Sequence, residues 1–216
     1  MKYEKIVSEI KKGNFAPIYT LCGEEAYYID QIEALLLENA ISEEQKDFNL
    51  SIHYGEDADV GQIIDNAKRY PMMSERQVVV VRECQLLDDF KNLEQYASAP
   101  LDTTILILLY KHGKPNGKFK VTKALKKKPN VFFESKSLYD NQVPRWIRNY
   151  LQRKGYKIEG KETQILSEYL GTDLGKVANE LDKLTINLSE GETITSKIIE
   201  QNIGISPDYS LFVLQE

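Results

Sequence analysis

The chain has 216 residues, enough for one large or two modest domains, and its 42% hydrophobic and 28% charged residues are ordinary for a globular protein. A net charge of −5 excludes binding of a polyanion through bulk charge alone, and no apolar run reaches the ~20 residues needed to span a membrane. Two cysteines without a histidine cluster exclude a disulfide scaffold, disfavour a zinc site and indicate a reducing, cytoplasmic location.

The first 137 residues alternate helical and strand patterns. The N-terminus begins directly with a mixed-charge helical pattern and has no apolar signal core, so we expect no export. Four helices are predicted: one at 3–12, one that begins at Glu24, one that begins after a cap at Asp57 or Asp59, and one at 86–97. Strands are predicted at 16–22, 48–54, 78–81, 103–109 and 131–133. This alternation predicts a doubly wound α/β domain with a mainly parallel sheet.

From residue 138 the strand patterns stop. Segments with an apolar period of three or four residues, separated by glycines, predict helices at 143–154, 161–170, 173–184 and 195–203. These helices predict a small all-α domain over residues 138–205. The final segment, 208–216, is amphipathic and has no terminating signal, which indicates a chain cut short of its natural end.

Two adjacent methionines, Met72 and Met73, follow Pro71 and shortly precede an unbroken valine run at 78–81. The valine run predicts a strand buried on both faces, at the centre of a parallel sheet. Adjacent residues cannot both face inward from one helix face, so we expect at least one methionine to point outward. A flexible apolar pair at a turn is typical of a protein-binding surface; core filling at the sheet edge is the alternative.

The turn after the first predicted strand lacks a phosphate-binding motif. A phosphate cradle needs the pattern Gly-x-x-x-x-Gly-Lys-Ser/Thr, whereas this turn has a single glycine, Gly23, followed by Glu24 and Glu25. These carboxylates complement the helix dipole and would repel a triphosphate. After the valine run, Glu83 is expected to be a surface charge rather than a magnesium ligand. We therefore expect no ATP hydrolysis and no nucleotide cofactor.

Other candidate sites are weaker. His53 and His112 have no nucleophile at a suggestive spacing, so we expect structural or surface roles, and Trp146 is expected to pack in a core. The segment Lys111–Lys128 contains eight lysines. It predicts either salt-dependent binding of nucleic acid or a solvated helix face.

Five stretches resemble, in their order along the chain, a known protein family. They are 17–25, 71–77 with the valine run, 122–127, 170–184 and 203–212. Together they resemble the delta subunit of the bacterial DNA polymerase III clamp loader. The resemblance runs along essentially the whole chain and rests on order and spacing rather than on one strong motif.

The resemblance implies an AAA+-like domain over 1–137 with a silent nucleotide site, a helical lid domain over 138–205, and the start of a linker at 206–216 to an absent C-terminal collar domain. It also implies a non-catalytic subunit of the polymerase holoenzyme that uses no cofactor. The implied partners are other clamp-loader subunits, bound through the collar domain, and primer-template DNA.

The resemblance also implies a role for the methionine pair. Family members insert a bulky apolar pair into a hydrophobic pocket of the sliding clamp, the beta subunit of the polymerase, and so open the ring for loading onto primed DNA. The implied clamp-binding residues are Pro71, Met72, Met73, Ser74, Arg76 and Gln77. Many family members carry leucine and phenylalanine here; methionines fill irregular pockets with less shape specificity.

Three functions compete. The first is a non-catalytic clamp-opening subunit. The second is a nucleic-acid-binding module that acts through Lys111–Lys128, with contacts from Lys123, Lys126, Lys127 and Lys128. The third is an ATPase with an unconventional site, which needs a phosphate-binding lysine that the first turn does not supply. We adopt the first as the hypothesis.

Overall fold

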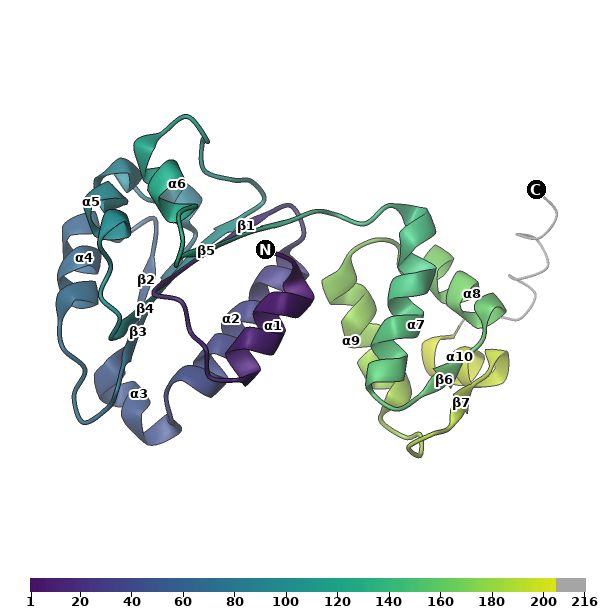
Figure 1. The fold of residues 1–216 in the computed structure, drawn as a ribbon. Helices are drawn as coiled ribbons and strands as arrows, with labels where there is room; N and C mark the ends of the chain where they lie inside the picture. The colour runs from purple at the N-terminus through teal and green to yellow at the C-terminus, as the bar shows by residue number, and fades with distance from the viewer. Residues whose placement is uncertain (205–216) are drawn as a thin grey trace. The chain divides into compact units, whose positions relative to one another are not determined.

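The computed structural model describes residues 1–204, which form two compact units, one of Met1–Lys136 and one that begins at Ser137 (Figure 1). Each unit has its own hydrophobic core. No helix within residues 1–204 combines the length and the apolar character that a membrane span requires. The predicted tail and linker after residue 205 lie outside the described residues.

A five-stranded parallel sheet forms the centre of the first unit. Its strands are β1 (Ile18–Gly23), β2 (Leu50–Tyr54), β3 (Gln77–Arg82), β4 (Thr104–Lys111) and β5 (Val131–Ser135), in the order β2-β3-β4-β1-β5. All neighbouring strands are parallel, which confirms the predicted sheet. The expectation that the valine strand is central is wrong, because β4 is central. Both β3 and β4 are buried on both faces, so an apolar run cannot tell them apart.

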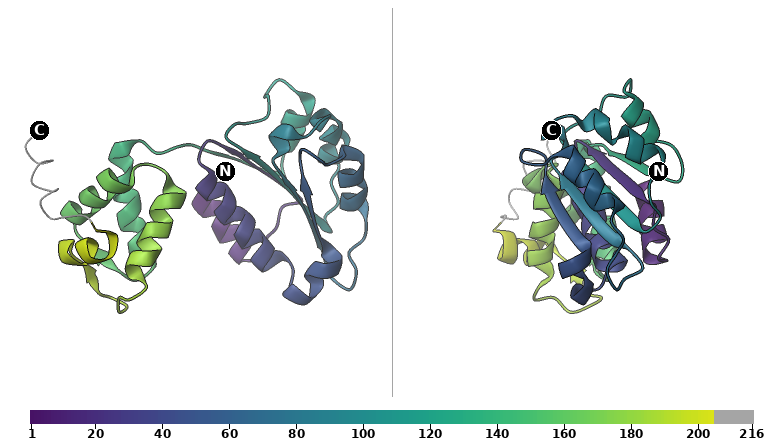
Figure 2. Two further views of the ribbon diagram at one scale, coloured as in Figure 1. Left: turned by 180° about the vertical axis from the view of Figure 1, so that it is seen from behind. Right: turned by 90° about the vertical axis from the view of Figure 1, so that its left-hand side faces the viewer.

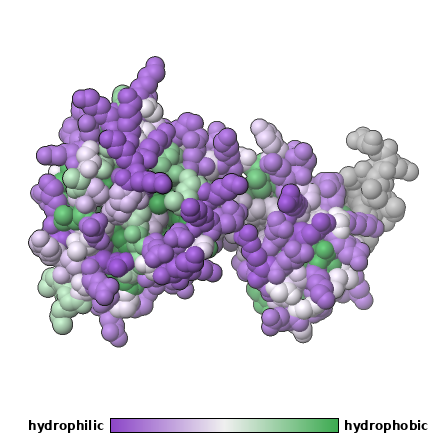
Figure 3. Space-filling view, in the orientation of Figure 1, coloured by the Kyte–Doolittle hydropathy of each residue, from purple (hydrophilic) through white to green (hydrophobic). Residues whose placement is uncertain are grey.

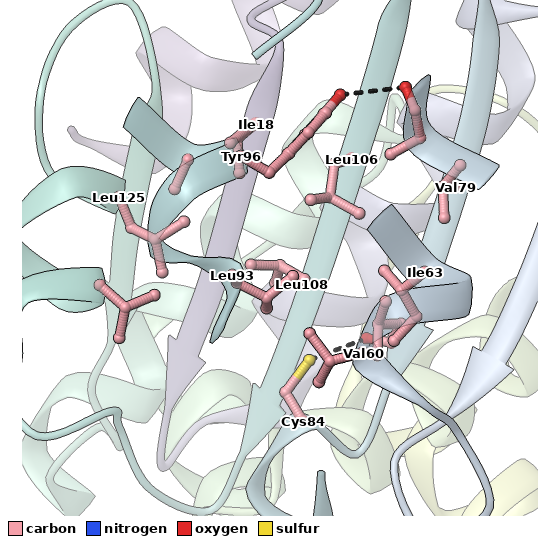
Figure 4. Packing of buried hydrophobic residues seen from close by; sticks show 14 of the residues in the cluster. Ile18, Val60, Ile63, Val79, Cys84, Leu93, Tyr96, Leu106, Leu108 and Leu125 are labelled. Atoms are coloured by element: carbon pink, nitrogen blue, oxygen red, sulfur yellow. Dashed lines mark hydrogen bonds between the residues drawn. The ribbon is translucent and has the colours of Figure 1, made fainter. Parts of the chain in front are cut away.

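Helices cover both faces of this sheet, as the doubly wound prediction requires (Figure 1 and Figure 2). One face carries α1 (Tyr3–Lys11) and α2 (Ala26–Ala40), and the other carries α4 (Val60–Lys68), α5 (Glu94–Ser98) and α6 (Lys120–Leu125). Because side chains alternate along a strand, Val78 and Val80 pack against α1 and α2, whereas Val79 and Val81 pack against the opposite helices. Figure 4 shows Val79 in the second of these clusters.

A helix that the sequence did not predict precedes β2. The predicted strand 48–54 begins only at Leu50, because the preceding residues form α3 (Glu43–Asn49). The Gln45 side chain accepts a hydrogen bond from the Ser42 backbone N–H at 3.2 Å, as in a capping box, and this contact favours a helix start at this point.

The predicted helix 86–97 is also wrong over most of its length. Two 3-10 turns, Cys84–Leu86 and Phe90–Leu93, lie there, and only the short α5 follows. Asp89 has a φ of +53°, in the left-handed region, which is incompatible with a continuous right-handed helix.

The second unit is helical with one short strand pair. Its helices are α7 (Val143–Arg153), α8 (Gly160–Leu170), α9 (Leu174–Thr185) and α10 (Ser196–Ile203). The predicted helices are confirmed, and Ile147, Leu166 and Leu181 are fully buried among them. The all-α prediction missed the parallel pair β6 (Lys157–Ile158) and β7 (Thr193–Ile194), because two residues are too few to show an alternating pattern.

We predict that Leu108→Ala lowers the free energy of unfolding by about 2–5 kcal/mol, because Leu108 is fully buried in the central strand and its truncation leaves a cavity. Urea unfolding followed by circular dichroism measures this loss. The matched control is Leu86→Ala: Leu86 is 49% exposed, and a change within roughly 0.5 kcal/mol is expected. Equal losses in the two variants would contradict this description of the core.

Candidate functional site

The connection between α4 and β3, residues 69–76, carries both methionines and is called the methionine loop below. It meets the sheet at its amino edge, since β3 begins at Gln77. Met72 is 60% exposed and Met73 is 98% exposed, so the core-filling alternative is wrong. In Figure 3 a pale green, hydrophobic protrusion lies at the lower left, in the region of α3 and this loop. The sequence-predicted apolar pair is thus presented to solvent.

Asn49, the last residue of α3, holds the middle of the methionine loop. Its Oδ1 accepts a hydrogen bond from the Met72 backbone N–H at 2.7 Å, and its Nδ2 donates to the Met72 carbonyl at 2.9 Å. Gln45, one turn earlier, donates to the Met73 carbonyl at 3.4 Å. Because Asn49 is only 2% exposed, water cannot easily replace its bonds, and their loss would leave unpaired polar groups.

The Gln77 side chain holds the start of the methionine loop through hydrogen bonds. Its Nε2 donates to the carbonyls of Asn66 and Arg69, 2.9 and 2.6 Å away, and lies 3.0 Å from the Thr104 hydroxyl. Gln77 is 2% exposed. The buried Gln77 side chain therefore holds the start of the loop and is not exposed to solvent, although the resemblance implied that it is one of the clamp-binding residues.

The end of α4 is held by two further hydroxyl groups. The Thr104 and Tyr96 hydroxyls both donate to the Ala67 carbonyl, at 2.8 and 3.2 Å; Figure 4 shows Tyr96 within the surrounding apolar cluster. The last carbonyls of a helix lack partners within the helix, so these buried donors satisfy one of them. The methionine loop consequently leaves α4 from a fixed point.

The remaining predicted loop residues contact the unit itself. The Ser74 hydroxyl donates to the Arg76 carbonyl at 3.0 Å, and the Arg76 guanidinium lies 4.9 Å from the centre of the Phe15 ring. Pro71 and Ser74 are half-buried. The structure thus brings the predicted residues together in one loop, in which the methionines face solvent and their neighbours hold the backbone.

The turn that follows β1 lies at the opposite, carboxyl edge of the sheet, roughly 20 Å away along a strand of six residues. Gly23 has a φ of +125°, and a Cβ there would lie 2.1 Å from the Ser135 carbonyl oxygen. The Glu25 carboxylate accepts a hydrogen bond from the Tyr27 N–H at 2.9 Å. A carboxylate therefore lies at the helix N-terminus, where a phosphate would otherwise bind.

The end of β3 carries an ion pair at this same edge. The Arg82 guanidinium contacts the Glu33 carboxylate at 2.8 Å and donates to the Tyr54 hydroxyl at 3.1 Å. Glu83 is exposed, which confirms the expectation of a surface charge. The first charged side chain after the valine strand is therefore engaged in holding α2 and β2 rather than facing a ligand.

The lysine segment 111–128 is divided by the fold. Lys111 forms an ion pair with Asp30 at 2.6 Å, and Lys114 forms one with Glu134 at 2.7 Å. Exposed ion pairs of this kind contribute little to stability. They do reduce the positive charge that these two lysines can offer to a polyanion.

The four predicted DNA-contacting lysines lie at the amino edge of the sheet or just before it. Lys123, Lys126, Lys127 and Lys128 are all exposed, near the end of α6 and in the turn that enters β5. The Lys126 ammonium lies 4.6 Å from the centre of the Phe132 ring. Strand β5 is three positions from β3, which corresponds to about 14 Å along the sheet. These lysines therefore share an edge with the methionine loop but form a separate cluster.

His53 is half-buried and both cysteines are buried. The His53 Nε2 lies 3.1 Å from the Asn66 amide nitrogen, and burial lowers the pKa of His53, so the neutral ring accepts this hydrogen bond. His112 is exposed. Burial raises the pKa of Cys22 to about 12 and also raises the pKa of Cys84, which keeps both thiols protonated and poorly nucleophilic at neutral pH.

Sequence reasoning missed Gln45 and Asn49, the residues that hold the loop. The spacing Ser42-x-x-Gln45 was an available signal, because it is the capping-box pattern that begins a helix. No sequence signal linked Asn49 to Met72, which is 23 residues away.

Residues 19–135 match the profile of a protein family described as DNA polymerase III, delta subunit. A curated relative, DNA polymerase III subunit delta of Bacillus subtilis strain 168, is 27% identical over 215 residues, which cover 95% of this chain and 62% of the relative. The chain therefore spans less than two thirds of the length of that relative.

Solved structures agree with this similarity. The Bacillus subtilis DNA clamp loader delta protein YqeN has a TM-score of 0.77 and 26% identity, over 93% of this chain and 62% of that chain. A RuvB mutant from Thermotoga maritima has a TM-score of 0.50 and 12% identity, over 94% of this chain and 70% of that chain. At that identity the likeness concerns the fold alone, and it agrees with the predicted AAA+-like fold.

We predict that Asn49→Ala lowers the free energy of unfolding by about 1–3 kcal/mol and speeds hydrogen exchange at the Met72 amide, because buried polar groups lose their partners. Exchange measured by mass spectrometry over residues 69–76 tests the local effect. Asn39→Ala is the control, since Asn39 is exposed on α2 and its side chain donates to the Leu35 carbonyl of its own helix. Unchanged exchange in Asn49→Ala would contradict the assigned role of Asn49.

Proposed function

The chain belongs to the DNA polymerase III delta subunit family, and on that premise we propose that it is a non-catalytic subunit of a replicative clamp loader. In this proposal it binds the sliding clamp, the DNA polymerase III beta subunit, through the methionine loop. Binding opens the ring so that it can be placed around primed DNA. The whole assembly works in the cytoplasm.

The observation that carries the proposal is an exposed apolar pair on a backbone that is held at several points. Burial of two methionine side chains contributes on the order of 1.5–3 kcal/mol each before the cost of association. A loop already held by Asn49 and Gln77 loses little further conformational entropy on binding. Exposed methionines on a rigid support are thus well suited to a hydrophobic pocket on a partner.

Ring opening follows from differential affinity. A partner that binds the open form of a clamp interface more tightly than the closed form shifts the ring toward opening by that difference in free energy. The chain needs no chemistry of its own for this step. Its contribution is binding energy, applied at one interface of the ring.

The carboxyl edge supports a subunit without ATPase activity. Glu25 places a carboxylate at the helix N-terminus, where it would repel a triphosphate, and Gly23 packs closely against Ser135. In the proposal, ATP is hydrolysed by neighbouring subunits. They assemble with the full-length protein through a C-terminal collar domain, and the loader carries primer-template DNA.

Four exposed lysines favour a second candidate function, direct binding of nucleic acid. Lys123, Lys126, Lys127 and Lys128 lie together near the amino edge of the sheet, and within residues 1–204 none of them forms an ion pair. Each phosphate neutralised by a lysine releases counterions and strengthens binding at low salt. This function is compatible with clamp binding, because the two clusters lie three strands apart.

We predict that Met72→Ala/Met73→Ala abolishes binding of the chain to the sliding clamp of the same organism, since both apolar side chains are lost while their backbone hydrogen bonds remain. Surface plasmon resonance on immobilised clamp measures the effect. Leu86→Ala is the control, because Leu86 is an exposed apolar residue that follows the carboxyl end of β3. Clamp binding that survives the double substitution would place the site elsewhere, and no binding by the parent chain would refute the proposal.

We predict that Lys126→Ala/Lys127→Ala/Lys128→Ala weakens binding of primed DNA and flattens its salt dependence by about one unit of slope for each lost phosphate contact. Fluorescence anisotropy across a salt series measures both quantities. Clamp affinity should not change, because the lysines lie outside the methionine loop. Equal DNA affinity in the parent and the variant at every salt concentration would remove the second function.

A further inference from the structure

Two methionine side chains account for only part of a stable protein interface. Specific complexes bury about 800 Å² on each partner and use roughly 20–30 residues on each side. A partner that covers Met72 and Met73 must therefore also cover neighbouring surface. The structure indicates which neighbour this is.

Helix α3 is attached to the methionine loop. Asn49 forms two hydrogen bonds with the Met72 backbone, and Gln45 donates to the Met73 carbonyl. Gln45 and Asn49 are four residues apart and so lie on one face of α3, which is the face toward the loop. Helix α3 has only seven residues and is about 10 Å long, so its exposed side chains also lie near the methionine loop.

Phe48 makes this neighbouring surface apolar. It precedes Asn49 on α3 and is 62% exposed, although a phenylalanine is among the residues most often buried. An aromatic side chain on a helix presents a large contact area with few rotatable bonds, which is typical of residues that dominate binding energy. Tyr70, at the start of the loop, is 83% exposed and extends the apolar surface on the loop itself.

The charges on α3 indicate what surrounds the partner's apolar site. Glu44 lies four residues before Phe48, on the same side of the helix, and Asp47 is adjacent; both are exposed. Glu43 is neutralised by an ion pair with Lys46, whereas within residues 1–204 no ion pair engages Glu44 or Asp47. Basic side chains on the partner would complement these two carboxylates and speed encounter.

We propose that α3 is a second contact element for the partner of the methionine loop, with Phe48 as its anchor and with Glu44 and Asp47 facing basic residues beside an apolar site. This inference rests on the proposed function, since the partner is the sliding clamp. The interface is then bipartite, and Asn49 sets the spacing between its two apolar parts.

The test compares Phe48→Ala with Phe119→Ala in the whole chain. Phe119 is 53% exposed at the start of α6, away from the methionine loop. Surface plasmon resonance on immobilised clamp should give an affinity loss of about tenfold or more for Phe48→Ala and no change for Phe119→Ala. Alanine is the best helix former, so α3 should persist, and unchanged hydrogen exchange at Met72 would verify that the loop is undisturbed.

A charge-reversed variant tests the proposed role of Glu44 and Asp47. Glu44→Lys/Asp47→Lys should slow association several-fold, with a larger effect at low salt than at high salt. Parent-like affinity of Phe48→Ala, together with lost binding of Met72→Ala/Met73→Ala, would overturn this inference and leave the proposed function intact. Absence of binding by the parent chain would overturn both.

Discussion

Paired hydrogen bonds between the Asn49 side chain and the Met72 backbone are the constraint on which the methionine loop depends. The exposed methionine side chains make no favourable interaction with water that would hold the loop. In addition, Met73 has a φ of +50°, a conformation that costs on the order of 1–3 kcal/mol for a residue other than glycine. A buried amide that offers both a donor and an acceptor to one residue compensates for this cost. The loop backbone is therefore held by bonds within the unit itself.

The two edges of the sheet have different characters. In open α/β sheets, ligands bind beyond the carboxyl ends of the strands. In this chain that edge is occupied by groups of the protein itself: Glu25 at the start of α2, Ser135 against Gly23, and the pair of Arg82 with Glu33. The amino edge instead presents the methionines and the lysines of the α6–β5 turn. The proposed function therefore uses the amino edge, opposite to the edge at which open α/β sheets bind their ligands.

The sequence predicted the architecture well where one face or both faces of an element are buried. The valine run indicated a strand packed on both sides, and the valines do alternate between the two core clusters. The prediction of secondary structure failed in polar segments. Residues 43–49 carry few apolar residues, so α3 was missed, and the segment 86–97 is interrupted by the left-handed Asp89. Hydrophobic periodicity carries no information on such segments.

The same division applies to the candidate site. Pattern alone identified Met72 and Met73 as an apolar pair at a turn, because two adjacent methionines before a buried strand do not fit one helix face. It could not decide between a protein-binding pair and core filling, since full exposure of both side chains depends on which strands flank β3 and where α3 ends. It also could not identify Asn49, because the hydrogen bond from Asn49 to Met72, 23 residues away, forms only once parallel β2 and β3 bring their amino ends together. Phe48 was missed because it lies on α3, the helix that the sequence did not predict. Local sequence encodes local preference, whereas contacts between distant segments are decided by the order and direction of the strands.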